Sequence, residues 1–517
     1  MTVHLMRTRL SSLSVLVCAA LAGCNADAPA NLEIEASADR SENISAEAPS
    51  AGTASITVQL SPRAGVSGQQ RVNFAVPLPP GLLTNASQVR VMRSGAEIPA
   101  GRRSLASHPD GSVRSVQIQF DLQISGSTSV EVRVGEAPQT ASVALVPVAN
   151  TLVLHNGSDI PRVWAVLPAS WLSSSGAFGP QVTSASVAGT PLAIWDDHCD
   201  YTQYDVDSFL AQKSDGTVWL YDRGTTMYRG YARTGVLSPL TSAYRETSIY
   251  RRGLTGSGSS LAIGVPGKAS DLKYYYAQNM AIHYLLTGDD RFREGAEQVA
   301  YKMSLMWDPW YDGGFWTERH AGFQLLAYTW AAMVSDDRAS EFRDLADDAA
   351  DAVLDVQASN PPGYNSTTAR CFAHTASAHG EDFGYWGCSP WMSAILADGL
   401  DAYATLRGGS RATSARQSIV KLGRIIAQQG RDGDGRPVYW MGVGNSNDEV
   451  DDYEEHWGEA AYVVAMAWFH GGKQDSSLKQ AADQLTEGFA DHGVLPHMRS
   501  FNWQCRSAVA TPYYLKP

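Results

Sequence analysis

The sequence predicts a multidomain β + α protein: an N-terminal β-sandwich or small barrel, then an (α/α) toroid of five to six helical hairpins. Three features indicate this fold class. Apolar residues recur with a period near two up to about residue 141, and with a period near 3.6 after Asp200. A unit of an aromatic-rich helix, a tight Gly/Asp turn and a more charged helix then repeats along the chain. The turns within these units are short, whereas the connections between them are long.

Residues 1–23 are typical of a bacterial lipoprotein signal peptide. Arg7 and Arg9 precede an apolar stretch over residues 13–21, which is too short to span a bilayer. The following Leu-Ala-Gly-Cys resembles a lipobox, which implies cleavage before Cys24 and lipidation of its thiol; an ordinary secretory signal is the alternative. By the same resemblance, Asn25 favours the bacterial outer membrane, with the protein facing the periplasm or the cell surface. Residues 24–53 are rich in Ala, Ser and Glu, and we expect a disordered tether.

Charge and cysteine content narrow the partners and the compartment. A net charge of −13 argues against nucleic-acid binding, although a local basic cleft could still hold an anionic sugar polymer. We expect a monomer. Beyond Cys18 and Cys24, four cysteines remain, an even number that suits an oxidising compartment. Cys371–Cys388 is the natural pair and Cys199–Cys505 would join the start of the helical domain to its end, but the sequence leaves all three pairings open.

The β-rich domain is predicted over residues 54–200, including a connector. Short alternating segments such as SITVQL, RVNFAV and SVQIQFDL are separated by turn residues. The phrases VNFAVPLPPGLL (Val72–Leu83) and SHPDGSVRSVQIQF (Ser107–Phe120) resemble the N-terminal β domain of exo-rhamnogalacturonan-lyase-like proteins. Ser115 stands where that family has tryptophan. We expect further β structure and an irregular connection over residues 143–200, in which His198 forms a structural hydrogen bond.

The helical domain is predicted over residues 201–517, with the aromatic helix of each pair buried and the charged helix facing water. Repeated hairpins of this kind form either an open solenoid or a closed toroid. The long connections over residues 254–271, 308–317, 359–388 and 431–452 must share one end, and they concentrate Trp, Tyr, His and acidic residues. We therefore favour a toroid with its binding site at that end.

Aromatic and acidic side chains at this end suggest a polysaccharide ligand, because indole and phenol rings stack on sugar faces while polar groups bind hydroxyls. The stacking candidates from these loops are Trp310, Trp316, Trp386, Trp391, Trp440 and Trp457. The residues that we expect to bind substrate are Trp316, Trp386, Trp440, Glu318, Glu454 and His456.

The catalytic candidates fit β-elimination on a uronic-acid polymer, which requires a group on the carboxylate, a base and an acid. The helical domain resembles α/α-toroid polysaccharide lyases, and that resemblance implies Tyr and His for the proton steps and Asn, Arg or His for the carboxylate. Tyr275 and Asn279 are expected on one face near the start of a helix. The full set of catalytic candidates is Arg319, His320, His374, His379, Tyr385, Tyr275 and Asn279.

Two other functions remain open. An inverting glycoside hydrolase would use a pair of the acids Asp312, Glu318, Glu381, Asp382, Glu454 and Glu455. A non-catalytic glycan-binding lipoprotein would need only the aromatic residues. No organic cofactor is implied and no metal site is predicted, although His374, His379, Glu381 and His456 could bind a divalent ion.

Overall fold

The computed structural model describes residues 52–517 apart from 270, 307–316, 376–383, 445–447, 451–455, 494 and 517. The expected signal peptide, nearly all of the tether, Cys24, Trp316, His379 and Glu454 lie outside the described residues. The described chain belongs to one compact unit, Ala48–Pro517. Within the described ranges, no helix has both the length and the apolar character needed to cross a membrane.

The N-terminal strands form two antiparallel sheets and a hairpin. The larger sheet has the order β10-β1-β7-β3-β4, the smaller has the order β2-β6-β5, and β8 pairs with β9. Alternate residues of β1 and β7 are buried, as expected for strands with one wet face. The strands are β1 Ala54–Pro62, β2 Gly68–Pro77, β3 Val89–Arg93, β4 Ala96–Glu97, β5 Ala100–Ser107, β6 Val113–Ile124, β7 Thr128–Val134, β8 Leu152–His155, β9 Ser158–Pro161 and β10 Val163–Val166.

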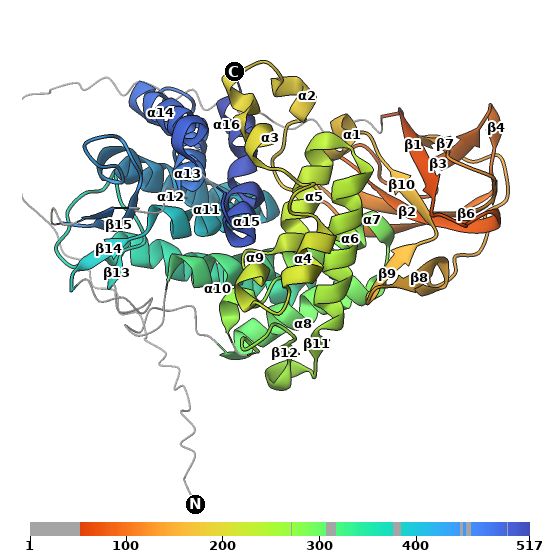
Figure 1. Ribbon diagram of the computed structural model, residues 1–517, viewed down its shortest axis with the longest axis horizontal. Helices are drawn as coiled ribbons and strands as arrows, with labels where there is room; N and C mark the ends of the chain where they lie inside the picture. The colour runs from red at the N-terminus through yellow and green to blue at the C-terminus, as the bar shows by residue number, and fades with distance from the viewer. Residues whose placement is uncertain are drawn as a thin grey trace, which may run out of the picture. The chain divides into compact units, whose positions relative to one another are not determined.

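The smaller sheet is covered on its second face by the helical region, so the first eight residues of β6 are all buried. Ser115 donates from Oγ to the carbonyl of Leu285 at 2.6 Å, and Tyr284 donates to the carbonyl of Leu105 at 2.8 Å. A small hydroxyl at position 115 therefore lets a helix end approach the sheet closely. Figure 1 shows β2 beside α7, in agreement with these contacts.

The strands β8 to β10 supply the further β structure expected after residue 143, and past β10 the connection, expected to be irregular, contains short helices. Its short helices are α1 Ala169–Ser174, α2 Ser184–Val187, α3 Ile194–His198 and α4 Val206–Gln212. His198 lies 3.2 Å from the carbonyl of Ile194 through Nδ1 and packs on Phe489, which fits the structural role expected for it.

The remaining helices pair in sequence. The first helix of each pair is buried almost throughout, as in α7, where every residue is buried, whereas α10 buries one stripe that includes Phe342, Ala346 and Val353. The pairs are α5 Arg223–Thr234 with α6 Leu237–Arg252, α7 Gln278–Thr287 with α8 Asp290–Met306, α9 Glu318–Val334 with α10 Ala339–Ser359, α11 Pro390–Arg407 with α12 Gly409–Gln429, and α13 Trp457–His470 with α14 Ser476–His492. The chain ends with α15 Met498–Arg506 and α16 Thr511–Leu515.

The buried helices form a closed ring. Each buried helix contacts the next one in the order α5, α7, α9, α11, α13 and α15, and α15 in turn packs against α5. An open solenoid would leave its first and last helices apart, so this closure supports the toroid over the solenoid. Figure 1 shows α15 and α5 side by side, although they are far apart in the sequence.

Both favoured disulfides are present. Cys199–Cys505 joins the connector to α15 across 306 residues, and Cys371–Cys388 joins the two ends of the loop before α11. The second bond holds the small sheet β13 (His374–Thr375) and β14 (Trp386–Cys388), which continues into β15 (Val438–Gly442) and β16 (Asp448–Val450).

Candidate functional site

The buried helices α9, α11, α13 and α15 begin near one another, next to the backbone that enters α5. We call these N-terminal ends, together with Tyr221, the mouth of the ring. The mouth collects rings and charges from six chain segments: Tyr221, Arg319, Trp391, Tyr439, His456, Glu459, Arg499 and Trp503.

Arg319, in the first turn of α9, is the central cation of the mouth. Its Nη1 donates to the hydroxyl of Tyr221 at 2.9 Å, and its guanidinium carbon lies 5.6 Å from the ring centroid of Trp391. No carboxylate within the described ranges pairs with it. A guanidinium with a neutral hydrogen-bond partner and an aromatic support retains donors for an anionic ligand.

Tyr221 and Asp222 both have left-handed backbones, with φ of 70° and 58°. Side chains with a Cβ rarely adopt this conformation, and it is found more often at functional sites. The turn directs the phenol of Tyr221 to Arg319, while the Asp222 carboxylate caps α5 and accepts from Nδ2 of Asn279 at 2.6 Å. Burial raises the pKa of both side chains, against the lowering effect of Arg319 on Tyr221 and of Arg506 on Asp222.

A stack of rings supports the cation. Trp391 and His456 lie 4.7 Å apart with an angle of 7° between their planes. Trp503 packs against both rings, at 5.4 Å and 5.0 Å between centroids, and meets Tyr221 edge-on at 5.0 Å. These contacts hold the His456 imidazole and the Tyr221 phenol close to the indole ring of Trp503.

Glu459 is the buried acid of the mouth. It is 3% exposed, and its Oε1 lies 3.7 Å from Nδ1 of His456. Neither carboxylate oxygen accepts a hydrogen bond from any residue that the structure describes. A buried carboxylate in this state is costly unless it orients a neighbour or binds a ligand.

The described residues of the mouth include positive groups besides Arg319. Arg499 lies 5.2 Å from the Trp503 ring and, like Arg319, has no carboxylate partner in the described part of the chain. Lys273 is close enough that burial and Arg319 together lower its pKa. These described cations are groups of the kind that bind an anionic ligand.

Two expected site residues, Glu318 and His374, bond to each other. Nε2 of His374 lies 2.7 Å from Oε2 of Glu318, and the other carboxylate oxygen accepts from the backbone N–H of Ser389 at 2.8 Å. Both side chains are fully buried and Trp440, also fully buried, packs edge-on against His374. This cluster joins α9, α11 and the small sheet at the mouth.

Tyr275 and Asn279 do not share a helix face, so that expectation was wrong. The helix begins only at Gln278, which leaves Tyr275 in the preceding turn. The hydroxyl of Tyr275 donates to the carbonyl of Ala269 at 2.5 Å, whereas Asn279 points to Asp222. The tyrosine thus fastens the connection over residues 254–271.

The other expected residues lie at the same end. Nδ1 of His320 is 2.5 Å from Oγ1 of Thr317, the residue that caps α9. Tyr385 and Trp386 are half-buried at the start of β14. Sequence reasoning missed Tyr221, Glu459, Arg499 and Trp503. The available signals were the position of Tyr221 one residue before the cap of α5 and the Trp-Gly-Glu phrase at the start of α13.

Comparisons with known proteins were made on sequence and on structure. No protein-family model and no curated protein matches the chain. Among solved structures, a sugar epimerase from a ruminal bacterium is similar at 15% identity and a TM-score of 0.43, over 57% of this chain and 89% of its own. Cellobiose 2-epimerase from Bacillus thermoamylovorans is similar at 14% identity and a TM-score of 0.36, over 55% of this chain and 76% of its own. An unsaturated glucuronyl hydrolase specific for heparin is similar at 13% identity and a TM-score of 0.40, over 58% of this chain and 86% of its own.

Likenesses at these TM-scores carry no conclusion about this chain. Its own contacts define a closed ring of helices, with arginines beside aromatic rings at the mouth.

Proposed function

We propose that the chain is a polysaccharide lyase that cleaves an acidic, uronic-acid-containing polysaccharide by β-elimination at the mouth. The observation that carries the proposal is the hydrogen bond from Arg319 to Tyr221 above the stacked rings of Trp391 and His456. This arrangement supplies one cation and two proton-transfer groups within one aromatic cluster.

Arg319 is proposed to bind the C6 carboxylate of the sugar. Two of its donors can face a carboxylate while Nη1 remains on Tyr221. Neutralising the carboxylate stabilises the negative charge that develops when the C5 proton leaves. A cation without a carboxylate partner of its own is suited to this task.

His456 is proposed to take the C5 proton, with Glu459 as its positioning residue. The carboxylate lies 3.7 Å from Nδ1, so it would stabilise the imidazolium that forms. Tyr221 is proposed to give its proton to the departing C4 oxygen. The C5–H and C4–O bonds then break, a C4–C5 double bond forms, and the phenolate left behind accepts hydrogen bonds from Arg319.

The state of Tyr221 supports this division of roles. Burial raises the pKa of its phenol, so the group stays protonated at neutral pH, as an acid must. Glu318 and His374, which were candidates for direct roles, are proposed to hold the mouth in shape because they are bonded to each other and Glu318 also accepts from the backbone of Ser389.

The test is a panel of uronate-containing polysaccharides assayed for the ultraviolet absorbance of the unsaturated product. We expect absorbance to rise together with new chain ends on at least one polymer. New reducing ends without this absorbance would exclude the lyase, and no new ends on any polymer would favour a non-catalytic binder.

Hydrolysis is the second candidate, and Asp222 is the observation in its favour. This buried carboxyl has a raised pKa, as a general acid requires, and Glu459 supplies a second buried carboxyl at the mouth. The hydrolase requires Asp222 to protonate the leaving oxygen. Asp222→Asn should then abolish formation of reducing ends, whereas the lyase needs Asp222 only as the cap of α5.

A further inference from the structure

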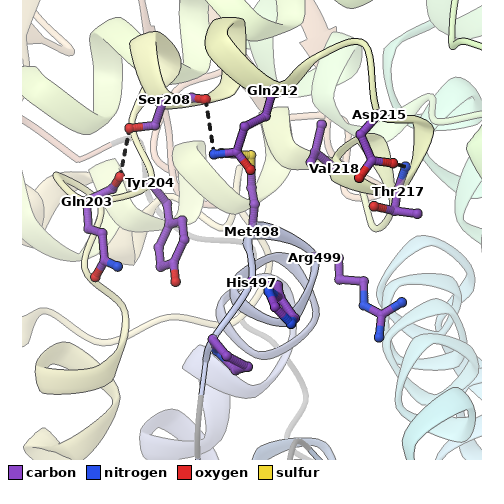
Figure 2. Close-up of a pocket in the computed structure, with 11 residues that line it drawn as sticks. Gln203, Tyr204, Ser208, Gln212, Asp215, Thr217, Val218, His497, Met498 and Arg499 are labelled. Carbon is purple, nitrogen blue, oxygen red and sulfur yellow. Dashed lines mark hydrogen bonds between the residues drawn. The ribbon is translucent and has the colours of Figure 1, made fainter.

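A cavity of about 570 Å³ lies next to the mouth, between the segment 203–218 and the start of α15. Figure 2 shows Ser208 and Gln212 on one wall and His497, Met498 and Arg499 on the other. Its volume is within the range of about 300–1,000 Å³ typical of small-molecule sites.

The walls of this cavity are held rigidly. Arg223 donates to the carbonyl of Tyr204 at 2.6 Å, to Asn502 at 3.1 Å and to both carboxylate oxygens of Glu246 at 2.7 Å. Asn502 in turn donates to the carbonyls of Val218 at 3.1 Å and Leu220 at 2.9 Å. Because one buried arginine and one buried asparagine join the two walls, the cavity is preformed.

The lining offers one guanidinium and several neutral polar groups, and its carboxylate, Asp215, accepts from the backbone N–H of Thr217 at 2.8 Å. Arg499 contributes a guanidinium with no carboxylate partner in the described chain, and Figure 2 shows it without a hydrogen bond to the other drawn residues. Its Nε is buried without a hydrogen-bond partner among the described residues. Ser208 donates from its hydroxyl to the carbonyl of Gln203 at 2.8 Å, and Gln212 donates from its amide to the carbonyl of Ser208 at 3.4 Å. The hydroxyl oxygen of Ser208 and the second amide N–H and the amide oxygen of Gln212 are the kind of groups that bind sugar hydroxyls.

The cavity adjoins the proposed catalytic groups through one residue. The guanidinium of Arg499 lies 5.2 Å from the ring of Trp503, whose opposite contacts are Tyr221 at 5.0 Å and His456 at 5.0 Å. A chain of linked sugars lying along Trp503 would therefore meet Arg319 with one unit and Arg499 with a neighbouring unit.

We propose that this cavity is a second subsite, in which Arg499 binds the carboxylate of a uronate unit next to the one held by Arg319. The inference rests on the proposed function for the identity of the polymer. It adds that the enzyme reads at least two acidic sugars, so the substrate is a run of adjacent uronates and not an isolated acidic unit in a neutral chain.

The experiment uses the full protein with oligogalacturonates and oligoguluronates of two and four units. We expect Arg499→Gln to weaken binding of the preferred tetrasaccharide about tenfold or more in calorimetry, the effect of one lost charge-assisted hydrogen bond. The loss should be larger for the tetrasaccharide than for the disaccharide. Gln212→Ala, on an exposed position of the opposite wall, should weaken tetrasaccharide binding by a smaller factor. Arg416→Gln, on an exposed position of α12, is the matched control and should bind as wild type.

The outcomes separate the two proposals. Wild-type binding by Arg499→Gln, or an equal loss for both chain lengths, would overturn the subsite. Tetrasaccharide binding that depends on Arg499 but yields no unsaturated product would overturn the lyase and leave the subsite standing. Failure of wild-type protein to bind any of these oligouronates would overturn the subsite as proposed.

Discussion

Two groups of buried charges in the ring, one in its interior and one at its mouth, differ in their partners. In the interior, the Asp398 carboxylate accepts hydrogen bonds from Arg229 at 3.0 Å, from Arg506 at 2.9 Å and from the hydroxyl of Tyr462 at 3.3 Å. Burial alone would raise the pKa of Asp398, but the two arginines hold it below its usual value. At the mouth, Glu459 is equally buried, yet its carboxylate accepts no hydrogen bond from the described residues.

This difference in partners distinguishes a structural charge network in the interior from a candidate functional site at the mouth. The interior charges join α5, α11, α13 and α15, and Asp398 uses both of its oxygens within the protein. Counting only partners among the described residues, Arg319, Arg499 and Glu459 at the mouth each keep a polar atom without a hydrogen bond, which costs free energy in the absence of a ligand. Stability is expected to depend on the first group and activity on the second.

The largest effect should follow Asp398→Asn. The change removes the negative partner of two buried arginines, and breaking a buried pair in this way costs about 3–5 kcal/mol in the free energy of unfolding. Urea denaturation measures the loss. Glu459→Gln is the matched isosteric control at the mouth and should leave the unfolding free energy unchanged or slightly raised while lowering kcat. Equal destabilisation by both changes would contradict the comparison.

Arg319→Gln should lower kcat about 10²–10³-fold on the preferred uronate polymer, the usual effect of removing one group that stabilises developing charge. The initial rate of ultraviolet absorbance measures it. Arg416→Gln on the exposed side of α12 is the control and should leave kcat unchanged. If Arg319→Gln lowered the thermal unfolding midpoint as well as kcat, Arg319 would belong with the structural charges of the interior instead.

Replacing Cys371 and Cys388 together by Ser tests how far the mouth depends on its loop. The bond closes a loop with a sequence separation of 17, and a loop of this size contributes about 3 kcal/mol in the chain-entropy model. Chemical denaturation of the double variant should show this loss. An unchanged unfolding midpoint would mean that the Glu318–His374 cluster alone holds the loop in place.

Sequence reasoning predicted which helix ends meet at one end of the ring, because helix periodicity and loop lengths carry that information, and it placed the candidate site there. It named Arg319 and His456, both of which stand at helix starts and contact Trp391. It favoured both disulfides, since Cys371 and Cys388 enclose one loop. These features follow from local pattern and chain connectivity.

The rest depends on contacts that local pattern does not encode. The partnership of Glu318 with His374 spans 56 positions and could not be read from either residue. The side chain of Tyr221 points to Arg319 because the backbone at Tyr221 is left-handed, and hydrophobic periodicity does not predict such a conformation. Tyr275 was misplaced because helix starts are uncertain by a few residues from sequence, and a start at Gln278 separates it from Asn279.

The smallest expected effect concerns pH and distinguishes the two regions once more. Tyr221 acts as an acid in the proposed reaction, and burial raises its pKa above the usual value of about 10. Activity needs the protonated phenol, so kcat/KM should not decline on the alkaline side until the pH exceeds about 10.

Buried tyrosines of the interior such as Tyr462 also have raised pKa values, so they contribute stability that is full below pH of about 10 and is lost as the pH rises further. A pH–rate profile recorded beside circular dichroism separates these effects. The role proposed for Tyr221 would be contradicted if kcat/KM declined well below pH 10 while circular dichroism showed an intact fold. The decline must not be caused by titration of His456.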